Sequence, residues 1–205
     1  MPAPAVPIIQ LDGDFTVHAV VGHLEQGDDA EAARDIGPAV AGDVFKSAMR
    51  VLSAGVVIVT TWVDGRPWGL TISSCCSLTH EPPQILASLR SNSVSCQEIV
   101  RTGRFGVSIL GAGQKSLAEI GAAPGVAKFM DEFCEAEGER EEPGAPMIIG
   151  SLFHLDCSVA NQIAVGDHEL IIGHVNRGFA NANETDSSPL IYYDRVFWSL
   201  GDKLT

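Results

Sequence analysis

Hydroxyl side chains gather in two short stretches of the chain, Thr71–Thr79 and Ser88–Ser93. In the first stretch, strand alternation places Thr71 and Ser73 on one face. The second stretch contains Arg90 and leads into the start of a short helix. Hydroxyls, exposed backbone amides and a guanidinium all donate hydrogen bonds, so together they could bind a phosphate group. Serine and threonine also serve in turns and helix caps, and the residue types alone leave both roles open.

A third candidate for chemistry is His168, in the sequence Val-Gly-Asp-His-Glu-Leu. Gly166 and Asp167 predict a tight turn, which would place the imidazole at the start of a strand, near the rim of a sheet. A histidine there could bind a ligand or exchange a proton, or it could be a solvated turn residue.

Several common sites have no support in the sequence. No G-x-G-x-x-G run opens a helix, so a dinucleotide would bind outside a Rossmann crevice. No G-x-S-x-G is present, as a serine hydrolase would need, and the GAGQKS segment lacks the upstream glycine of a phosphate loop. His168 and His174 would lie ~20 Å apart along one strand, too far for one ion. We therefore predict no metal site.

The segments that must position these candidates are mostly β-prone. Two runs rich in β-branched residues flank Asp64-Gly65 and predict a hairpin. Further strands are expected at Gln84 to Leu89 and in the segments FGVSIL, SLFHLDCSVANQIAV, HELIIGHVNRGFA and SPLIYYDRVFWSL. Helices are expected from Asp43, in VSCQEIVR and over residues 114–120. Strands outnumber helices without alternating with them, which favours a mainly β fold, an antiparallel barrel with a few flanking helices.

Length and charge narrow the class of protein. A chain of 205 residues, 45% of them hydrophobic, suits one domain, which we place at residues 43–205 after an N-terminal extension at 1–42. The net charge of −13 argues against nucleic acid or an anionic membrane as partner. No apolar run reaches the ~20 residues of a membrane span, and no secretory signal is recognisable. Five irregularly spaced cysteines indicate reduced thiols and a cytoplasmic location.

The charge is unevenly distributed. Residues 46–130 carry eight basic and four acidic side chains, a local charge of +4, while the rest of the chain carries −17. A positive segment in an acidic protein suits a small anionic ligand, although ordinary surface pairing would also account for it.

Four segments, in order and spacing, resemble the short-chain flavin reductases: FKSAMRVLSAGVVIVTTWVDGRPWGLTISSCCSLTHEPPQILASLR, FGVSIL, GDHELIIGHV and PLIYY. These are the NAD(P)H:flavin oxidoreductase components of two-component monooxygenases, and the likeness spans roughly residues 43 to 199. The resemblance implies an FMN-binding split barrel that reduces FMN or FAD with NADH or NADPH. It also implies a homodimer and a partner oxygenase that receives diffusible reduced flavin.

By position, the resemblance assigns roles to individual residues. The flavin-lining strand corresponds to Gly69, Leu70, Thr71, Ile72, Ser73 and Ser74. The segment that holds the ribityl phosphate supplies Ser88, Arg90, Asn92 and Ser93, and Lys128 and Phe129 would close over the flavin. His168 matches the histidine implicated in the nicotinamide site. The chain departs from the family pattern at Cys75-Cys76, where an aromatic-containing pair is usual, and after Arg195, where a glycine is common.

Two other functions stay open at this stage. The same barrel could bind flavin without reductase activity, or it could oxidise a small organic substrate through the flavin. Neither the choice of FMN or FAD nor that of NADH or NADPH follows from the residues.

Overall fold

The computed structural model describes residues 42–135, 144–180 and 188–201, all of which belong to one compact unit, Ala41–Thr205. The first helix, α1 (Gly42–Val51), begins within one residue of the expected position. Residues 1–41 lie outside the described part, so the division into an extension and a domain stays a prediction. None of the described helices is long and apolar enough to cross a membrane.

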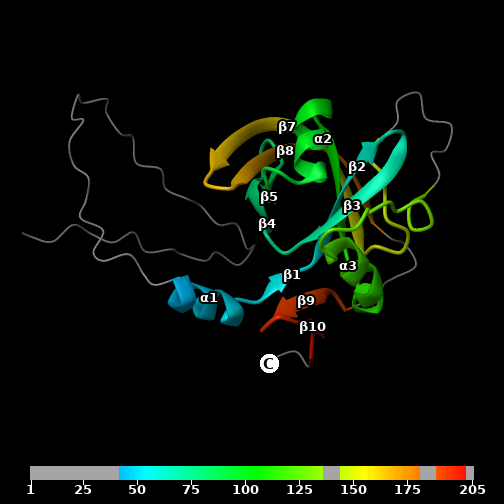
Figure 1. Cartoon of the computed structure of the whole chain (residues 1–205). Coiled ribbons are helices and arrows are strands. Elements are labelled where there is room, and N and C mark those ends of the chain that lie inside the picture. Colours follow the sequence, from blue (N-terminus) through cyan, green and yellow to red (C-terminus); the bar gives the residue numbers. More distant parts are fainter. Residues whose placement is uncertain (1–41, 136–143, 181–187, 202–205) are drawn as a thin grey trace, which may run out of the picture. The chain divides into compact units, whose positions relative to one another are not determined.

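Seven strands form one antiparallel sheet in the order β3-β2-β6-β7-β8-β5-β4 (Figure 1). A second sheet has the order β1-β9-β10. The mainly β, antiparallel fold is therefore confirmed. The strands of the large sheet are β2 (Val57–Val63), β3 (Arg66–Ile72), β4 (Cys75–Thr79), β5 (Gln84–Arg90), β6 (Arg104–Ile109), β7 (Phe153–Val165) and β8 (His168–Ala180), and those of the small sheet are β1 (Ala54–Gly55), β9 (Leu190–Tyr193) and β10 (Val196–Ser199).

The hairpin of β2 and β3 turns as the sequence predicts. Val63 pairs with Arg66 across a two-residue loop, in which Asp64 and Gly65 have φ of 51° and 74°. Both angles are positive, as in a type I′ turn, whose twist matches that of the flanking strands. This turn fixes the register that brings residues 69–72 alongside the buried part of β2.

β2 lies between two hydrophobic clusters, because its side chains alternate between the two faces of the sheet. Val57 and Val59 belong to a cluster with Phe105 and Ile171, which α2 (Val94–Thr102) covers. Ile58 faces the other cluster, which includes Leu110, Met130, Ile148 and Leu190. The second cluster joins the large sheet to β9 and to α3 (Lys115–Ala122), which follows a short 3₁₀ turn, η1 (Ala112–Gln114).

The expected helix after β5 is confirmed, with a defined cap at each end. The Ser93 hydroxyl accepts a hydrogen bond from the backbone N–H of Cys96 at 3.2 Å. At the other end, Gly103 adopts φ 70° and its N–H donates to the carbonyl of Ile99. The Ser93 cap holds the start of α2 beside the end of β5, where the second group of hydroxyls lies, and the Gly103 cap ends the helix.

Candidate functional site

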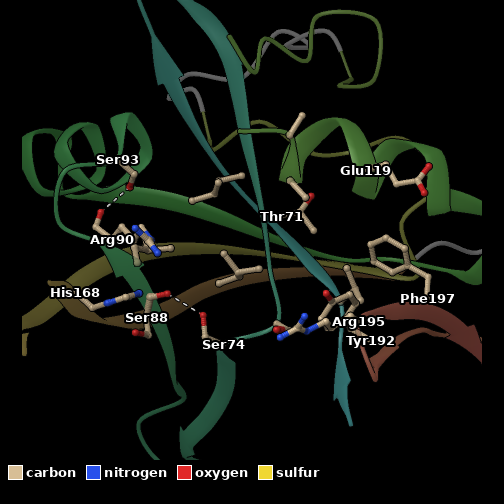
Figure 2. Close-up of a pocket in the computed structure, with 17 residues that line it drawn as sticks. Thr71, Ser74, Ser88, Arg90, Ser93, Glu119, His168, Tyr192, Arg195 and Phe197 are labelled. Atoms are coloured by element: carbon tan, nitrogen blue, oxygen red, sulfur yellow. Dashed lines mark hydrogen bonds between the residues drawn. The ribbon is translucent and has the colours of Figure 1, made fainter. Parts of the chain in front are cut away.

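A cavity of about 580 Å³ lies where residues 70–74, at the end of β3, face β5, α3 and the hairpin of β9 and β10 (Figure 2). Its size is within the range of small-molecule and cofactor sites. One part of the wall is apolar and is formed by Val56, Leu70, Ile72, Leu89, Tyr192 and Phe197. The polar and charged lining residues are Thr71, Ser73, Ser74, Ser88, Arg90, Ser93, Glu119, His168 and Arg195.

The two predicted groups of hydroxyls come together in this cavity. The backbone N–H of Ser88 donates to the carbonyl of Ser74 at 2.9 Å, and the Ser74 hydroxyl donates to the carbonyl of Ser88 at 2.8 Å. This double link ties the chain after β3 to the middle of β5. The Ser93 hydroxyl donates to the carbonyl of Arg90 at 2.7 Å, so it both caps α2 and shapes the turn after β5. The structural role is therefore present, and because the same residues line the cavity, the phosphate-binding role stays a prediction.

Thr71 supplies a hydroxyl that the fold leaves unused. Its Oγ1 is buried and has no hydrogen-bond partner among the described residues. The side chain lies against Gly121 of α3, where a methyl group would come within 2.3 Å of that oxygen. A buried polar atom without a partner is costly, and this oxygen is enclosed by the contact between β3 and α3.

His168 occupies the predicted turn at the cavity edge. Gly166 has φ 60°, and the backbone carbonyl of Asp167 accepts hydrogen bonds from the N–H and the hydroxyl of Ser91. His168 pairs in register with Arg90 on β5, which brings these two side chains to the same end of the cavity. The His168 Nδ1 lies 2.6 Å from a carboxylate oxygen of Asp167, and this hydrogen bond lowers the pKa of Asp167. A proton on Nδ1 leaves Nε2 to meet a ligand.

Four of the predicted site residues lie outside the cavity lining: Gly69, Asn92, Lys128 and Phe129. A Cβ at Gly69 would meet Ile58 and Met130, so this glycine allows close packing behind the cavity wall. Asn92 is in the turn between β5 and α2.

Lys128 and Phe129 have partners of their own. Phe129 packs edge-on against Trp68, with ring centroids 5.0 Å apart, and the Arg66 guanidinium lies 3.8 Å from its ring centre. Lys128 is buried, which lowers its pKa, and its Nζ donates to the carbonyl of Ala123. Ala123 lines the cavity, so Lys128 supports the wall from behind. The expected closure of both residues over a flavin stays a prediction.

Tyr192, Arg195 and Phe197 line the cavity but were not predicted as site residues. The prediction of a single strand over residues 188–200 was wrong, because β9 and β10 are separate strands joined by the two-residue turn Asp194-Arg195. The sequence does contain a pattern that indicates this hairpin, because two aromatic-rich runs flank a pair of polar residues. That pair is Asp-Arg, whereas Asn-Gly is typical of such turns, so the residue types did not predict a turn there.

The cavity is lined by more positive than negative charge. Arg90 and Arg195 enter it from different elements and lie on opposite sides in Figure 2. Glu119 is the acidic residue of the lining, and its carboxylate is 2.5 Å from the Nζ of Lys115. An anionic ligand would therefore meet two guanidinium groups and a carboxylate that is already paired.

Comparisons with known proteins agree on one family. Residues 49–201 match the family described as flavin reductase like domain. The chain is 35% identical over 170 residues to a flavin reductase (NADH) from Kitasatospora aureofaciens, an alignment that covers 80% of this chain and 84% of that protein. It is 33% identical over 150 residues to the reductase subunit HsaB of a flavin-dependent monooxygenase from Mycobacterium tuberculosis, covering 73% and 77% of the two chains.

A solved structure extends the likeness to three dimensions. The NADH:FAD oxidoreductase of Streptomyces globisporus, in complex with NAD and FAD fragments, superposes with a TM-score of 0.66 at 26% identity. The superposition covers 78% of this chain and 93% of that one.

Proposed function

The chain belongs to the flavin reductase like family, and from this premise we propose that its cavity binds a flavin and a nicotinamide nucleotide next to one another. The fold is a split barrel and the activity is that of an NAD(P)H:flavin oxidoreductase. The observation that carries the proposed site is the meeting of residues 70–74 with Ser88–Ser93 around one cavity of cofactor size.

The polar end of the cavity fits the phosphate of a flavin. Ser88 and Arg90 line it beside the N-terminus of α2, which is nine residues long and begins after Ser93. A helix N-terminus, a hydroxyl and a guanidinium together favour an anion, because all of them present donors. The ribityl phosphate of FMN, or the corresponding phosphate of FAD, would be held there.

The apolar part of the cavity fits an isoalloxazine ring. Leu70 and Ile72 on β3 and Tyr192 and Phe197 on the small sheet offer flat or branched surfaces for contact with a ring. These residues therefore fit the cofactor that the family uses.

A bound flavin supplies the chemistry, since it accepts a hydride from the nicotinamide. The chain itself binds both molecules, keeps water from the apolar wall and offers donors and positive charge where negative charge develops. His168 is held by Asp167 with Nε2 available, which suits it to position the nicotinamide or the flavin edge. Hydride transfer by itself requires no proton from His168.

The assembly is proposed to be a homodimer. Leu78 on the edge strand β4 and Ile163 and Val165 at the end of β7 are exposed apolar side chains. An unpaired edge strand and apolar surface of this kind favour association with a second copy. Light scattering coupled to size-exclusion chromatography measures this directly, and a monomer at micromolar concentration would refute it.

The physiological partner is proposed to be an oxygenase that uses reduced flavin. HsaB, to which the chain is similar, is the reductase subunit of a flavin-dependent monooxygenase. We place the protein in the cytoplasm, where NADH or NADPH is available.

The activity assay combines the protein with FMN or FAD and with NADH or NADPH, and follows nicotinamide absorbance. Oxidation faster than in buffer is expected with at least one pair. Tight flavin binding without oxidation would instead indicate a flavin-binding protein without reductase activity. Hydrogen peroxide formed from an organic substrate without NADH would indicate an oxidase.

The role of His168 has its own test. His168→Ala is expected to raise KM for the nicotinamide nucleotide or to lower kcat, with nearly unchanged flavin affinity. His174→Ala, on the same strand and outside the cavity lining, is the control. An equal loss of flavin binding in His168→Ala would contradict the assigned role.

A further inference from the structure

Arg195 has a backbone conformation that its residue type disfavours. Asp194 and Arg195 are the two loop residues of the hairpin between β9 and β10, with φ of 48° and 66°. Positive φ at both positions is typical of Asn-Gly, because side chains with a Cβ are strained there. Strain of this kind persists where the position of the side chain matters, so the Arg195 side chain is a candidate for function.

The turn is anchored from one side. Arg50, near the end of α1, donates a hydrogen bond to the carboxylate of Asp194 at 2.7 Å, and its carbonyl accepts the backbone N–H of Asp194 at 2.9 Å. These contacts fix the turn at Asp194 and leave Arg195 to extend toward Ser74, as Figure 2 shows. Arg195 is therefore directed into the cavity by the hairpin and by α1 together.

The acidic groups near Arg195 are already paired with other cations. Asp194 binds Arg50, and Glu119 binds Lys115. Within the part of the chain that the structure describes, Arg195 forms no salt bridge or side-chain hydrogen bond. Its planar guanidinium, which carries five N–H donors, is left to bind an anion.

A second cavity lies beyond Arg195. It has a volume of about 280 Å³, and its lining includes Phe45, Met49 and Leu52 of the α1 segment together with Tyr193. Arg195 and Tyr192 line both cavities, so the guanidinium lies at their junction. An extended ligand could therefore place its ring system in the larger cavity, an anionic group at Arg195 and a second aromatic group in the smaller cavity.

We propose that Arg195 binds the pyrophosphate of NAD(P)H, whose adenosine half lies against Phe45 and Met49. This rests on the proposed function, which supplies the nicotinamide dinucleotide. FAD does not use the site, because the phosphate that it shares with FMN is held at the other end of the cavity by Ser88 and Arg90. Arg195 thus acts on the nicotinamide nucleotide and not on the flavin.

The test compares NADH with its mononucleotide and with flavins. Kd is measured for FAD, FMN and riboflavin and, without turnover, for NADH. KM is measured for NADH and for reduced nicotinamide mononucleotide with riboflavin as acceptor. The main variant is Arg195→Gly, which removes the guanidinium and relieves the strained backbone. Asp64→Gly is the matched control, because it also introduces glycine at a positive-φ position of a hairpin turn, that between β2 and β3, outside the cavity.

Arg195→Gly is expected to weaken binding of NADH about tenfold, the effect of one charge-assisted hydrogen bond. Binding of the reduced mononucleotide, which keeps one of the two phosphates, should weaken less. The Kd of FAD, FMN and riboflavin should be unaffected, and the midpoint of thermal unfolding should not fall. Phe45→Ala should act in the same direction, with a smaller effect.

Two results would overturn the proposal. Unchanged binding of NADH in Arg195→Gly would show that the guanidinium does not contact it. An equal loss of FMN or FAD binding would show that Arg195 only maintains the cavity. Failure of the proposed function is distinguishable, because the wild-type protein would then oxidise no NADH, whereas the Kd of NADH is measured without turnover.

Discussion

Gly121 provides a quantitative test of the contact between α3 and β3. This buried residue packs against Thr71, and a Cβ at position 121 would lie 2.3 Å from Thr71 Oγ1 and 3.1 Å from its backbone N. Normal non-bonded contacts are about 3.5 Å or longer, so Gly121→Ala requires α3 and β3 to separate by about 1 Å. Because Thr71, Ala122 and Ala123 line the cavity, the cavity itself must change shape.

Two opposing energies determine the outcome of this substitution. Alanine favours a helix over glycine by about 1 kcal/mol, while forcing extra volume into a packed interface costs about 1–3 kcal/mol. The free energy of unfolding should therefore fall by up to about 2 kcal/mol. A displacement of about 1 Å at an active site can cost about 100-fold in rate, so kcat/KM should fall more than stability alone would suggest.

Urea unfolding measures the stability, steady-state oxidation of NADH measures kcat/KM, and flavin titration measures the affinity of the cavity. Gly113→Ala is the control, because a Cβ at Gly113 would meet no atom within 4 Å, and its stability and flavin affinity should stay at wild-type values. If Gly121→Ala were as stable as wild type and bound flavin equally well, α3 would not be packed on Thr71 as described.

The cysteines give two further predictions. Burial raises the pKa of Cys75, Cys134 and Cys157 to about 12, so a thiol reagent at neutral pH should react quickly with the exposed Cys76 alone, and Cys76→Ser should abolish the fast phase. A second fast thiol would contradict the burial. The folded state also retains thiol protons that the unfolded state releases above its ordinary pKa of 9.0. Stability should therefore be complete below pH 9 and decline between pH 9 and about 12, by up to about 1.4 kcal/mol per pH unit for each thiol. Cys157→Ala should reduce this slope in urea unfolding measured at several pH values, and an unchanged slope would refute the assignment.

Local signals predicted much of the fold. Asp64-Gly65 between two β-branched runs specified a hairpin and its register, because few other residue pairs accept positive φ at both loop positions. Ser93 and Gly103 delimited α2 through their capping chemistry. The hairpin at Asp194-Arg195 escaped because its residues contradict the usual turn preference, as expected where a functional position overrides local propensity.

The site was only partly accessible from the sequence. Thr71, Ser88 and His168 could be placed near one another through the family resemblance, and the strand register then brought them to one cavity. The contributions of Arg195 and Phe197 depend on where the small sheet packs, which is a long-range contact with no local signature. Lys128 illustrates the opposite case, since its buried Nζ supports Ala123 and does not line the cavity.

The most direct test of the account is flavin binding by a variant whose cavity is filled. Ser73→Trp places an indole in the cavity lining, and Ser77→Trp places the same group on β4, outside the lining, so the two exposed positions form a matched pair. Ser73→Trp should abolish measurable FMN and FAD binding and NADH oxidation at unchanged thermal stability, while Ser77→Trp should keep both. Wild-type flavin affinity in Ser73→Trp would show that the flavin binds elsewhere.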